Sequence, residues 1–285
     1  MKRILILGCG YAGERLAARH IERGDRVTGT TRDAERAARL RALGVRVLAP
    51  HEELPQMDRV YYTIPPQRDG VEDIRLTGLL KRLPPPREFV YFGTTGVYGD
   101  QDGAWVNEDT ELKPNNERSM RRADAEWQCR GWCAMHGVAL TILRIAGIYG
   151  PGRLPIDRLD NGKPVLDPVS SGYTNRIHVD DLVAAAMAAA DAHGKVMAEV
   201  FNVADGNPTT TAEFLDAFAA MTGKPAPERI GWAEARAEFS EMALSFMRDS
   251  KRVNVDRLLA IDGFRLRYPD FRDGLRASMT DGSNA

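Results

Sequence analysis

The sequence predicts an α/β protein in which helices cover both faces of a doubly wound, mostly parallel sheet, with a small C-terminal lobe. Three observations support this class. The chain opens with an apolar run, Ile4 to Leu7, that breaks into glycines and continues as an amphipathic helix. Short apolar runs then alternate with helical patterns as far as residue 224. The 285 residues can hold one large domain of this kind with a small appendage.

The glycines that follow the first strand have the spacing G-x-G-x-x-G. Gly8 permits a tight turn, Gly10 lets the backbone approach a pyrophosphate, and Gly13 lets the helix pack close to the strand. The start of that helix offers unpaired N–H groups and a partial positive charge to phosphates. Between a strand and a helix, the pattern predicts a dinucleotide site that also contacts Tyr11 and Ala12. The alternative is a structural turn that binds no ligand.

The second strand, expected at 26–30, ends where this kind of fold selects its coenzyme. NAD binders usually place Asp or Glu there, to accept from the ribose 2′-hydroxyl. This chain has Thr30 and Thr31, followed by Arg32. A guanidinium pairs with a 2′-phosphate, which a carboxylate would repel, so we expect NADP(H) in preference to NAD(H). The alternative is that Arg32 only begins a solvated helix, with Asp33 as its N-cap.

Later strands end in loops that border the same cleft. The fourth, expected at 59–63, leads into Ile64 and Pro65, where proline stiffens the wall. The sixth, expected at 139–144, leads into a glycine and proline loop that begins with Ala146 and Gly147. Because the carboxyl ends of parallel strands share one edge, we expect these four residues to border the coenzyme. The other elements expected in this part of the chain are a strand at 45–48 and helices at 71–83 and 117–136.

The fifth strand, expected at 88–92, ends in Gly93 and the pair Thr94 and Thr95. Two hydroxyls flanked by glycines indicate a polar group placed at the carboxyl edge of the sheet, where ligands bind. We therefore expect Thr94 on the same edge as the glycine turn.

Past residue 150 the sequence predicts a short strand running into a helix at NRIHVDDL and a strand at EVFNVADG. A helix with Thr211 as N-cap and Gly223 as C-cap follows, then a polar helix near 232–247. We expect residues 1–150 and 176–224 to form the dinucleotide-binding domain, and residues 151–175 and 225–285 to form the lobe.

The composition argues against several classes of function. The formal net charge is −1, so no basic surplus favours nucleic acid or an anionic membrane surface, and small molecules are the expected partners. Cys9, Cys129 and Cys133 make no even disulfide framework, and no Cys and His cluster supplies metal ligands. The first apolar run is too short for a secretion signal and no run spans a membrane, so we expect a cytoplasmic protein.

Five motifs occur in a fixed order: the glycine turn, TTGVYGD, RIAGIYGPGR, NRIHVDDL and FNVADG. Together they resemble the extended short-chain dehydrogenase/reductase family of NAD-dependent epimerases and dehydratases, over residues 1–275, and point to an atypical, YeeZ-like subgroup. The resemblance implies a Rossmann-type domain of about seven parallel strands with NAD(P) across their carboxyl edge. It also implies a smaller C-terminal lobe over the substrate, and a homodimer formed by the two long mid-chain helices.

The resemblance assigns roles to two residues of the loop that follows the fifth strand. In the family's S/T-x-x-x-Y-G motif, the hydroxyl four residues before the tyrosine holds the reacting oxygen of the substrate. Thr94 stands in that place, and a hydroxyl donor suits a developing oxyanion. Tyr98 is the nearest phenol in sequence for the proton transfer. The alternative is that Thr94 only satisfies the backbone of its turn.

The chain departs from the family at its catalytic pair, Y-x-x-x-K, in which the lysine lowers the pKa of the tyrosine phenol. Arg118 stands in place of the tyrosine and Arg122 in place of the lysine. Arginine stays protonated, so Arg118 cannot readily exchange a proton as a phenol does. The arginines with which family members grip a sugar diphosphate fall on Thr174 and near Glu238, so a nucleotide sugar is not assumed.

Two functions from different classes fit these residues. The first is an NADP-dependent oxidoreductase or epimerase-like enzyme that acts on a small carbonyl or carbinol substrate. Arg118, Arg121 and Arg122 would then hold an anionic group by charge-assisted bonds, although a solvated basic face explains them equally well. The second is a catalytically silent module that binds NADP(H) and reports its state to a protein partner. The missing tyrosine and lysine motivate this second hypothesis.

Overall fold

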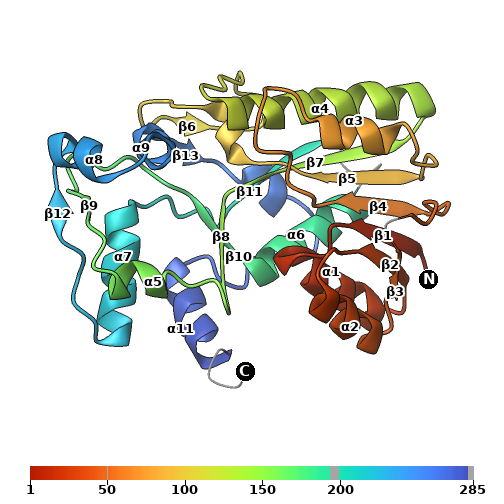
Figure 1. Ribbon diagram of the computed structural model, residues 1–285, viewed down its shortest axis with the longest axis horizontal. Coiled ribbons are helices and arrows are strands. Elements are labelled where there is room, and N and C mark those ends of the chain that lie inside the picture. The colour runs from red at the N-terminus through yellow and green to blue at the C-terminus, as the bar shows by residue number, and fades with distance from the viewer. Residues whose placement is uncertain (50, 193–198, 282–285) are drawn as a thin grey trace.

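A computed structural model gives the structure of residues 1–49, 51–192 and 199–281. The central sheet has seven strands in the order β11-β7-β5-β4-β1-β2-β3 (Figure 1). Every pairing within it is parallel, which confirms the predicted doubly wound, mostly parallel sheet. Its strands are β1 (Arg3–Leu7), β2 (Arg26–Thr30), β3 (Arg46–Val47), β4 (Arg59–Tyr62), β5 (Glu88–Phe92), β7 (Ala139–Ile145) and β11 (Val200–Val203).

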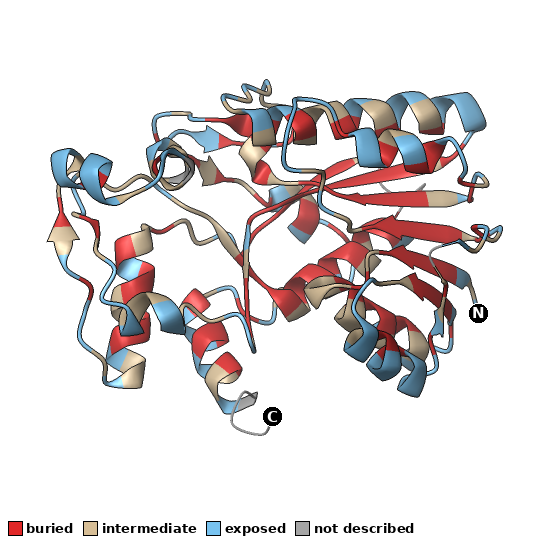
Figure 2. Cartoon of the chain, viewed as in Figure 1, coloured by how far each residue is buried: buried red, intermediate tan, exposed pale blue. Residues whose placement is uncertain are grey.

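The strands divide their side chains between two cores. In β1, Ile4 and Ile6 face one core, and Leu5 and Leu7 face the other. This is the alternation expected of a strand that is buried on both faces. Figure 2 shows the strands buried and the outer faces of the helices exposed. The first core is covered by α1 (Tyr11–Glu22), α2 (Ala34–Ala42) and α6 (Val179–Asp191), and the second by α3 (Ile74–Leu80) and α4 (Glu117–His136).

The lobe has a third core between α7 (Thr211–Thr222) and α11 (Phe271–Asp281), which lie together beside the sheet in Figure 1. Phe214 and Phe218 of α7 pack in it with Phe271 of α11. The expected domain boundary assigns 176–224, and with it α7, to the dinucleotide-binding domain. The apolar face of α7 is buried against the lobe and not against the sheet. The other helices of the lobe are α5 (Ile156–Asp160), α8 (Trp232–Glu238) and α9 (Glu241–Arg248).

The segment 225–285, expected in the lobe, also contributes to the core under the sheet. Helix α10 (Asp256–Leu259) contacts β11, and Leu258, Ile261 and Phe264 belong to the core under the sheet. Part of the segment 225–285 therefore belongs to the larger domain. Three two-stranded parallel sheets connect the loops: β6 (Trp105–Val106) with β13 (Arg252–Val253), β8 (Gly147–Tyr149) with β10 (Arg176–His178), and β9 (Val165–Leu166) with β12 (Arg229–Ile230).

Side-chain caps account for the helix ends that differ from expectation. Asp73 accepts from the third residue of α3, so the helix expected over 71–83 starts later. Ser240 caps α9 and divides the helix expected near 232–247 into α8 and α9. The cap of α7 is Thr210, one residue before the expected position.

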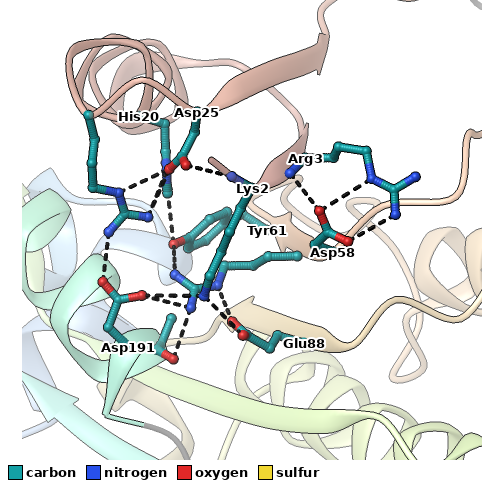
Figure 3. A network of polar contacts seen from close by, with 11 residues as sticks. Lys2, Arg3, His20, Asp25, Asp58, Tyr61, Glu88 and Asp191 are labelled. Atoms are coloured by element: carbon teal, nitrogen blue, oxygen red, sulfur yellow. Dashed lines mark hydrogen bonds and ion pairs between the residues drawn. The ribbon is translucent and has the colours of Figure 1, made fainter.

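A buried polar network closes the amino end of the sheet (Figure 3). Arg59 on β4 is fully buried, and its guanidinium pairs with Glu88 on β5 and with Asp191 at the end of α6, 2.8 Å from Asp191 Oδ1. It also donates to the carbonyl oxygen of Ala190 at 3.0 Å. One cation therefore joins two neighbouring strands to the helix that covers them.

His20 extends this network to α1. Its Nδ1 lies 2.8 Å from Asp25 Oδ2 and its Nε2 lies 3.1 Å from the hydroxyl of Tyr61. Burial lowers the pKa of His20 to about 4 although Asp25 opposes this. The imidazole is thus neutral at pH 7, with its Nδ1–H donated to the carboxylate.

We predict that Arg59→Met lowers the free energy of unfolding by about 3 kcal/mol, because it leaves two carboxylates and a buried phenol without their shared cation. Urea denaturation followed by circular dichroism measures the change. Arg3→Met is the matched control, since the ion pair of Arg3 with Asp58 lies at the same end of the sheet with half of the arginine side chain exposed. That variant should unfold almost as the wild type does. Equal losses in both variants would contradict the special role of the buried cation.

Candidate functional site

The loops singled out in the sequence lie at the carboxyl edge of the sheet, because the strands that precede them are parallel. Strand order reverses at β1, with β2 and β3 on one side and the other four strands on the other. Doubly wound sheets bind their ligands at such a switch point. The glycine turn follows β1 and therefore stands at the switch point, and Thr94 follows β5, two strands away.

The glycine turn has space where a coenzyme would need it. Gly8 has φ +94°, and a Cβ there would lie 2.7 Å from Ile64 Cγ1. A Cβ on Gly13 would lie 2.8 Å from the carbonyl oxygen of Gly8, so close packing requires both glycines. Gly10 differs, because among the described residues its Cβ would meet only Gly8 O, at 3.9 Å. Helix α1 begins beside Gly10 without a side-chain cap. These features fit an anionic group such as a diphosphate.

Tyr11 joins the glycine turn to the loop that follows β8. Its hydroxyl donates to the carbonyl oxygen of Pro151 at 3.0 Å. The guanidinium carbons of Arg15 and Arg153 lie 4.2 and 5.4 Å from the centre of its ring. Ala12 packs against the core under the sheet. The side chains of Tyr11 and Ala12 thus pack within the protein. A ligand at the glycine turn would contact these two residues through their backbone N–H groups.

At the end of β2, two threonine hydroxyls form hydrogen bonds within the protein and one arginine side chain is exposed. The hydroxyl oxygen of Thr30 accepts from the N–H of Gly8 at 2.9 Å, so Thr30 supports the glycine turn. Thr31 Oγ1 accepts from the N–H of Asp33 at 3.2 Å, and Asp33 caps α2. Arg32 is exposed, precedes the helix, and has no ion pair or side-chain hydrogen bond with any residue that the structure describes. Its guanidinium is therefore available for an anion at this edge.

Thr94 caps the 3-10 turn η1 (Thr95–Tyr98) that follows β5. Its Oγ1 accepts from the N–H of Gly96 at 3.1 Å, and the residue is half-buried. The hydroxyl proton itself has no acceptor within the described parts of the chain. The oxygen of Thr94 thus satisfies the turn, as the alternative interpretation holds, while its O–H remains able to donate.

Tyr98 is the last residue of this turn, and it is fully buried. Its hydroxyl donates to Asn202 Oδ1 at 2.7 Å and accepts from Arg144 Nη1 at 3.0 Å. Burial raises the pKa of Tyr98 to about 12. The phenol of Tyr98 thus both donates and accepts a hydrogen bond within the protein.

The hydroxyl of Tyr98 belongs to a buried polar network centred on Arg144 and Glu126. This network was not predicted from the sequence. The guanidinium donates to both carboxylate oxygens of Glu126, at 3.1 and 2.9 Å, and to the carbonyl oxygen of Glu108 at 3.1 Å. An arginine at the end of an apolar strand was the available signal, because such a charge requires a buried partner.

The three arginines at the start of α4 point to different partners. Arg121 is buried and donates to the carbonyl oxygen of Gly70. Arg122 donates to the carbonyl oxygen of Phe92 and lies 5.0 Å from the centre of the Tyr91 ring. Burial lowers the pKa of Arg118, Arg121 lowers it further, and Asp249 opposes the shift. They do not form a single solvated face.

The remaining predicted contacts lie at the ends of β4 and β7. Ile64 packs partly against the core, and the carbonyl oxygen of Pro65 accepts from Arg75 at 3.1 Å. Ala146 donates its N–H to Val203 at 2.9 Å, and Gly147 is exposed.

Among the described residues, no group of three or more His, Cys, Asp or Glu side chains could hold a metal ion. Cys129 and Cys133 are buried in the core under α4. No helix within the described ranges is long and apolar enough to cross a membrane.

Comparisons with known sequences give relatives for the chain. Residues 70–204 match the NAD dependent epimerase/dehydratase family. Protein YeeZ of Escherichia coli (strain K12) is 30% identical over 208 residues, which are 65% of this chain and 72% of YeeZ. A 3-diazoavenalumate denitrifying reductase of a Streptomyces species is 29% identical over 148 residues, 50% of this chain and 48% of the reductase.

Solved structures share the fold. A functionally unknown conserved protein from Silicibacter pomeroyi DSS superposes with a TM-score of 0.85 and 32% identity over 99% of each chain. UDP-glucuronic acid 4-epimerase from Bacillus cereus, in complex with NAD, superposes with a TM-score of 0.75 and 17% identity over 99% of each chain. The predicted family is confirmed: this chain belongs to the NAD-dependent epimerase/dehydratase family and has YeeZ as a relative.

Proposed function

We propose that this protein is an NADP(H)-dependent oxidoreductase that acts on a small carbonyl or carbinol substrate with an anionic group. One observation carries the proposal: the glycine turn, the basic end of β2 and the hydroxyl of Thr94 share the edge of the sheet at its switch point. The related epimerase from Bacillus cereus binds NAD, and the Streptomyces relative is a reductase. A nicotinamide coenzyme bound here would supply or accept hydride. The contacts proposed for it are Gly8, Gly10, Tyr11, Ala12, Gly13, Thr31, Arg32, Ile64, Pro65, Thr94, Ala146 and Gly147.

In this proposal Thr94 donates its hydroxyl to the reacting oxygen of the substrate. The bond from the N–H of Gly96 to Thr94 Oγ1 fixes the oxygen and leaves the proton to point elsewhere. A donor that is already oriented stabilises negative charge as it develops, without reorganisation during the reaction. Tyr98 has no part in the step, because its phenol is buried and fully hydrogen-bonded.

Arg118 is the proposed contact for the anionic group. Burial and the neighbouring charge of Arg121 raise the free energy of its charged form, and Asp249 offsets part of this. An incoming carboxylate would lower that free energy through charge-assisted hydrogen bonds. Arg121 and Arg122 are turned toward backbone carbonyls, so we assign them no direct contact with the substrate.

We predict that the protein oxidises NADPH in the presence of some members of a panel of carbonyl compounds, with lower KM for those that carry a carboxylate. Thr94→Ala should lower kcat about 100-fold, because it removes a donor to the developing oxyanion. Thr94→Ser should keep most of the activity. Absorbance of the reduced nicotinamide follows the reaction. Tight NADPH binding without turnover of any compound would favour the silent NADP(H)-binding module instead.

The coenzyme preference has its own test. We predict that Arg32→Asp weakens NADPH binding about 10- to 100-fold and leaves NADH binding equal or tighter, because a carboxylate replaces the partner of the 2′-phosphate. Calorimetric titration with both coenzymes measures the change. Arg41→Asp, an equal change of charge at an exposed position in the last turn of α2, serves as the control and should keep the preference. Equal affinity of the wild type for the two coenzymes would contradict the proposal.

We also propose a homodimer formed through α3 and α4. The side chains of Trp127 and Met135 on α4 are 76% and 80% exposed, and that of Ile74 on the neighbouring α3 is 62% exposed. Large apolar side chains gathered on adjacent helices are typical of an association surface.

We expect a dimer of the wild type in sedimentation velocity at micromolar concentration. Trp127→Glu should shift the population to monomer, because a buried carboxylate would oppose association. Trp105→Glu is the control, since Trp105 is 53% exposed on β6, a strand that pairs with β13 and belongs to neither helix. A monomeric wild type would contradict the proposed dimer.

A further inference from the structure

Three buried polar atoms between the sheet and helices α3 and α4 have no hydrogen-bond partner among the residues that the structure describes. They are the hydroxyls of Tyr62 and Tyr91 and the Oδ2 of Asp73. All three side chains are at most 1% exposed. An unsatisfied buried polar atom costs about 1–3 kcal/mol, so three together need an explanation such as enclosed water.

Strand register places the two phenols together. Tyr62 on β4 pairs with Tyr91 on β5, so both side chains point to the α3 and α4 face of the sheet. Their rings are stacked with centres 6.1 Å apart. Each would pack equally well as phenylalanine, so packing alone does not explain the hydroxyls.

Asp73 reaches the same region from the start of α3. Its Oδ1 accepts from the N–H of Leu76 at 3.0 Å as the helix cap, which leaves Oδ2 without a partner among the described residues. Its own N–H donates to Asp124 Oδ2 on α4 at 2.7 Å. Burial raises the pKa of Asp73, and Asp124 adds to the shift, while the N–H of Leu76 and the charge of Arg122 oppose it. The carboxyl therefore keeps its proton to a higher pH than an exposed aspartate does.

Arg122 connects this region to the candidate site. Its guanidinium lies over the ring of Tyr91 and donates to the carbonyl oxygen of Phe92, two residues before Thr94. Its charge also influences both tyrosine hydroxyls and Asp73. Arg122 stands at the position that the resemblance assigns to the family's lysine, and the resemblance therefore puts this end of the region nearest the reacting groups. The ionisable groups that face Asp73 are Arg122, Asp124 and Cys129 on α4, Tyr62 on β4 and Tyr91 on β5.

We propose that Asp73, Tyr62 and Tyr91 enclose water molecules that carry a proton from Asp73 past Arg122 to the substrate held at Thr94. The O–H bond of the Asp73 carboxyl breaks, protons shift along the water and phenol chain, and a new O–H bond forms on the substrate oxygen. Solvent then returns a proton to Asp73. This inference rests on the proposed oxidoreductase function and supplies the proton that the absent family tyrosine would have given. Asp73 acts through water and is a positioning residue rather than a catalytic one.

The test removes the proton source and the hydroxyls separately. Asp73→Asn keeps a good helix cap while it removes the carboxyl. It should lower kcat for carbonyl reduction about 10- to 100-fold and abolish the fall of kcat as pH rises through the pKa of Asp73. The double variant Tyr62→Phe, Tyr91→Phe should lower kcat similarly without loss of stability. Tyr61→Phe is the control, because Tyr61 lies on the same strand but faces the opposite core. It should keep the pH profile of the wild type.

A measurement without turnover separates this inference from the proposed function. Difference infrared spectra of the wild type, recorded across the pH range, should show carbonyl bands of buried protonated carboxyls. Asp73→Asn should lose one of these bands and keep that of Asp205, whose pKa burial raises to about 7. If the spectra of the wild type and of Asp73→Asn are the same, the relay is wrong whatever the activity. If the wild type turns over and the variants keep its kcat and pH profile, the relay is wrong and the oxidoreductase stands. If no compound is turned over, the proposed function fails and the relay fails with it.

Discussion

The ion pair between Arg144 and Glu126 is the constraint on which the carboxyl edge of the sheet depends. Arg144 belongs to β7 and Glu126 to α4, and both side chains are at most 4% exposed. Separating them would leave two buried charges without partners, which costs several kcal/mol. The pair therefore holds α4 against the sheet. The same helix carries Arg118 and Arg122, and Arg122 donates to the carbonyl oxygen of Phe92, two residues before Thr94.

The pair also organises the loops around it. Arg144 donates to the hydroxyl of Tyr98, and that hydroxyl donates to Asn202 on β11. Because Tyr98 ends the turn that Thr94 caps, these bonds fix the position of the turn. At the opposite end of the strands, the network around Arg59 joins the sheet to α6 and uses its polar groups internally. The amino end is thus closed by its own interactions. The carboxyl end keeps donors, at Arg32 and Thr94, that no other described residue accepts from. This division is expected where one edge provides stability and the other binds ligands.

Local patterns allowed the sheet and the glycine turn to be predicted, because strand periodicity and glycine spacing are properties of neighbouring residues. The two networks could not be predicted in the same way. A charged residue such as Arg59 or Arg144 within an apolar strand shows that a buried partner exists, but the partner is set by tertiary packing. The packing partner of α7 could not be predicted for the same reason. The periodicity of α7 indicates an apolar face, and only the packed structure shows that Phe214 meets the lobe and not the sheet.

Arginine at positions 118 and 122 changes what the site can do. A tyrosine and lysine pair exchanges protons at neutral pH, whereas two guanidinium groups attract anions and keep their protons. Under the proposed function, holding the substrate and moving a proton are therefore tasks for different groups. Arg118 and Thr94 are the residues proposed for the first task. The second requires a group that is not permanently charged, and Asp73, buried behind Arg122, is such a group. Under the proposed function, such a site would favour substrates that carry a negative charge over neutral sugars.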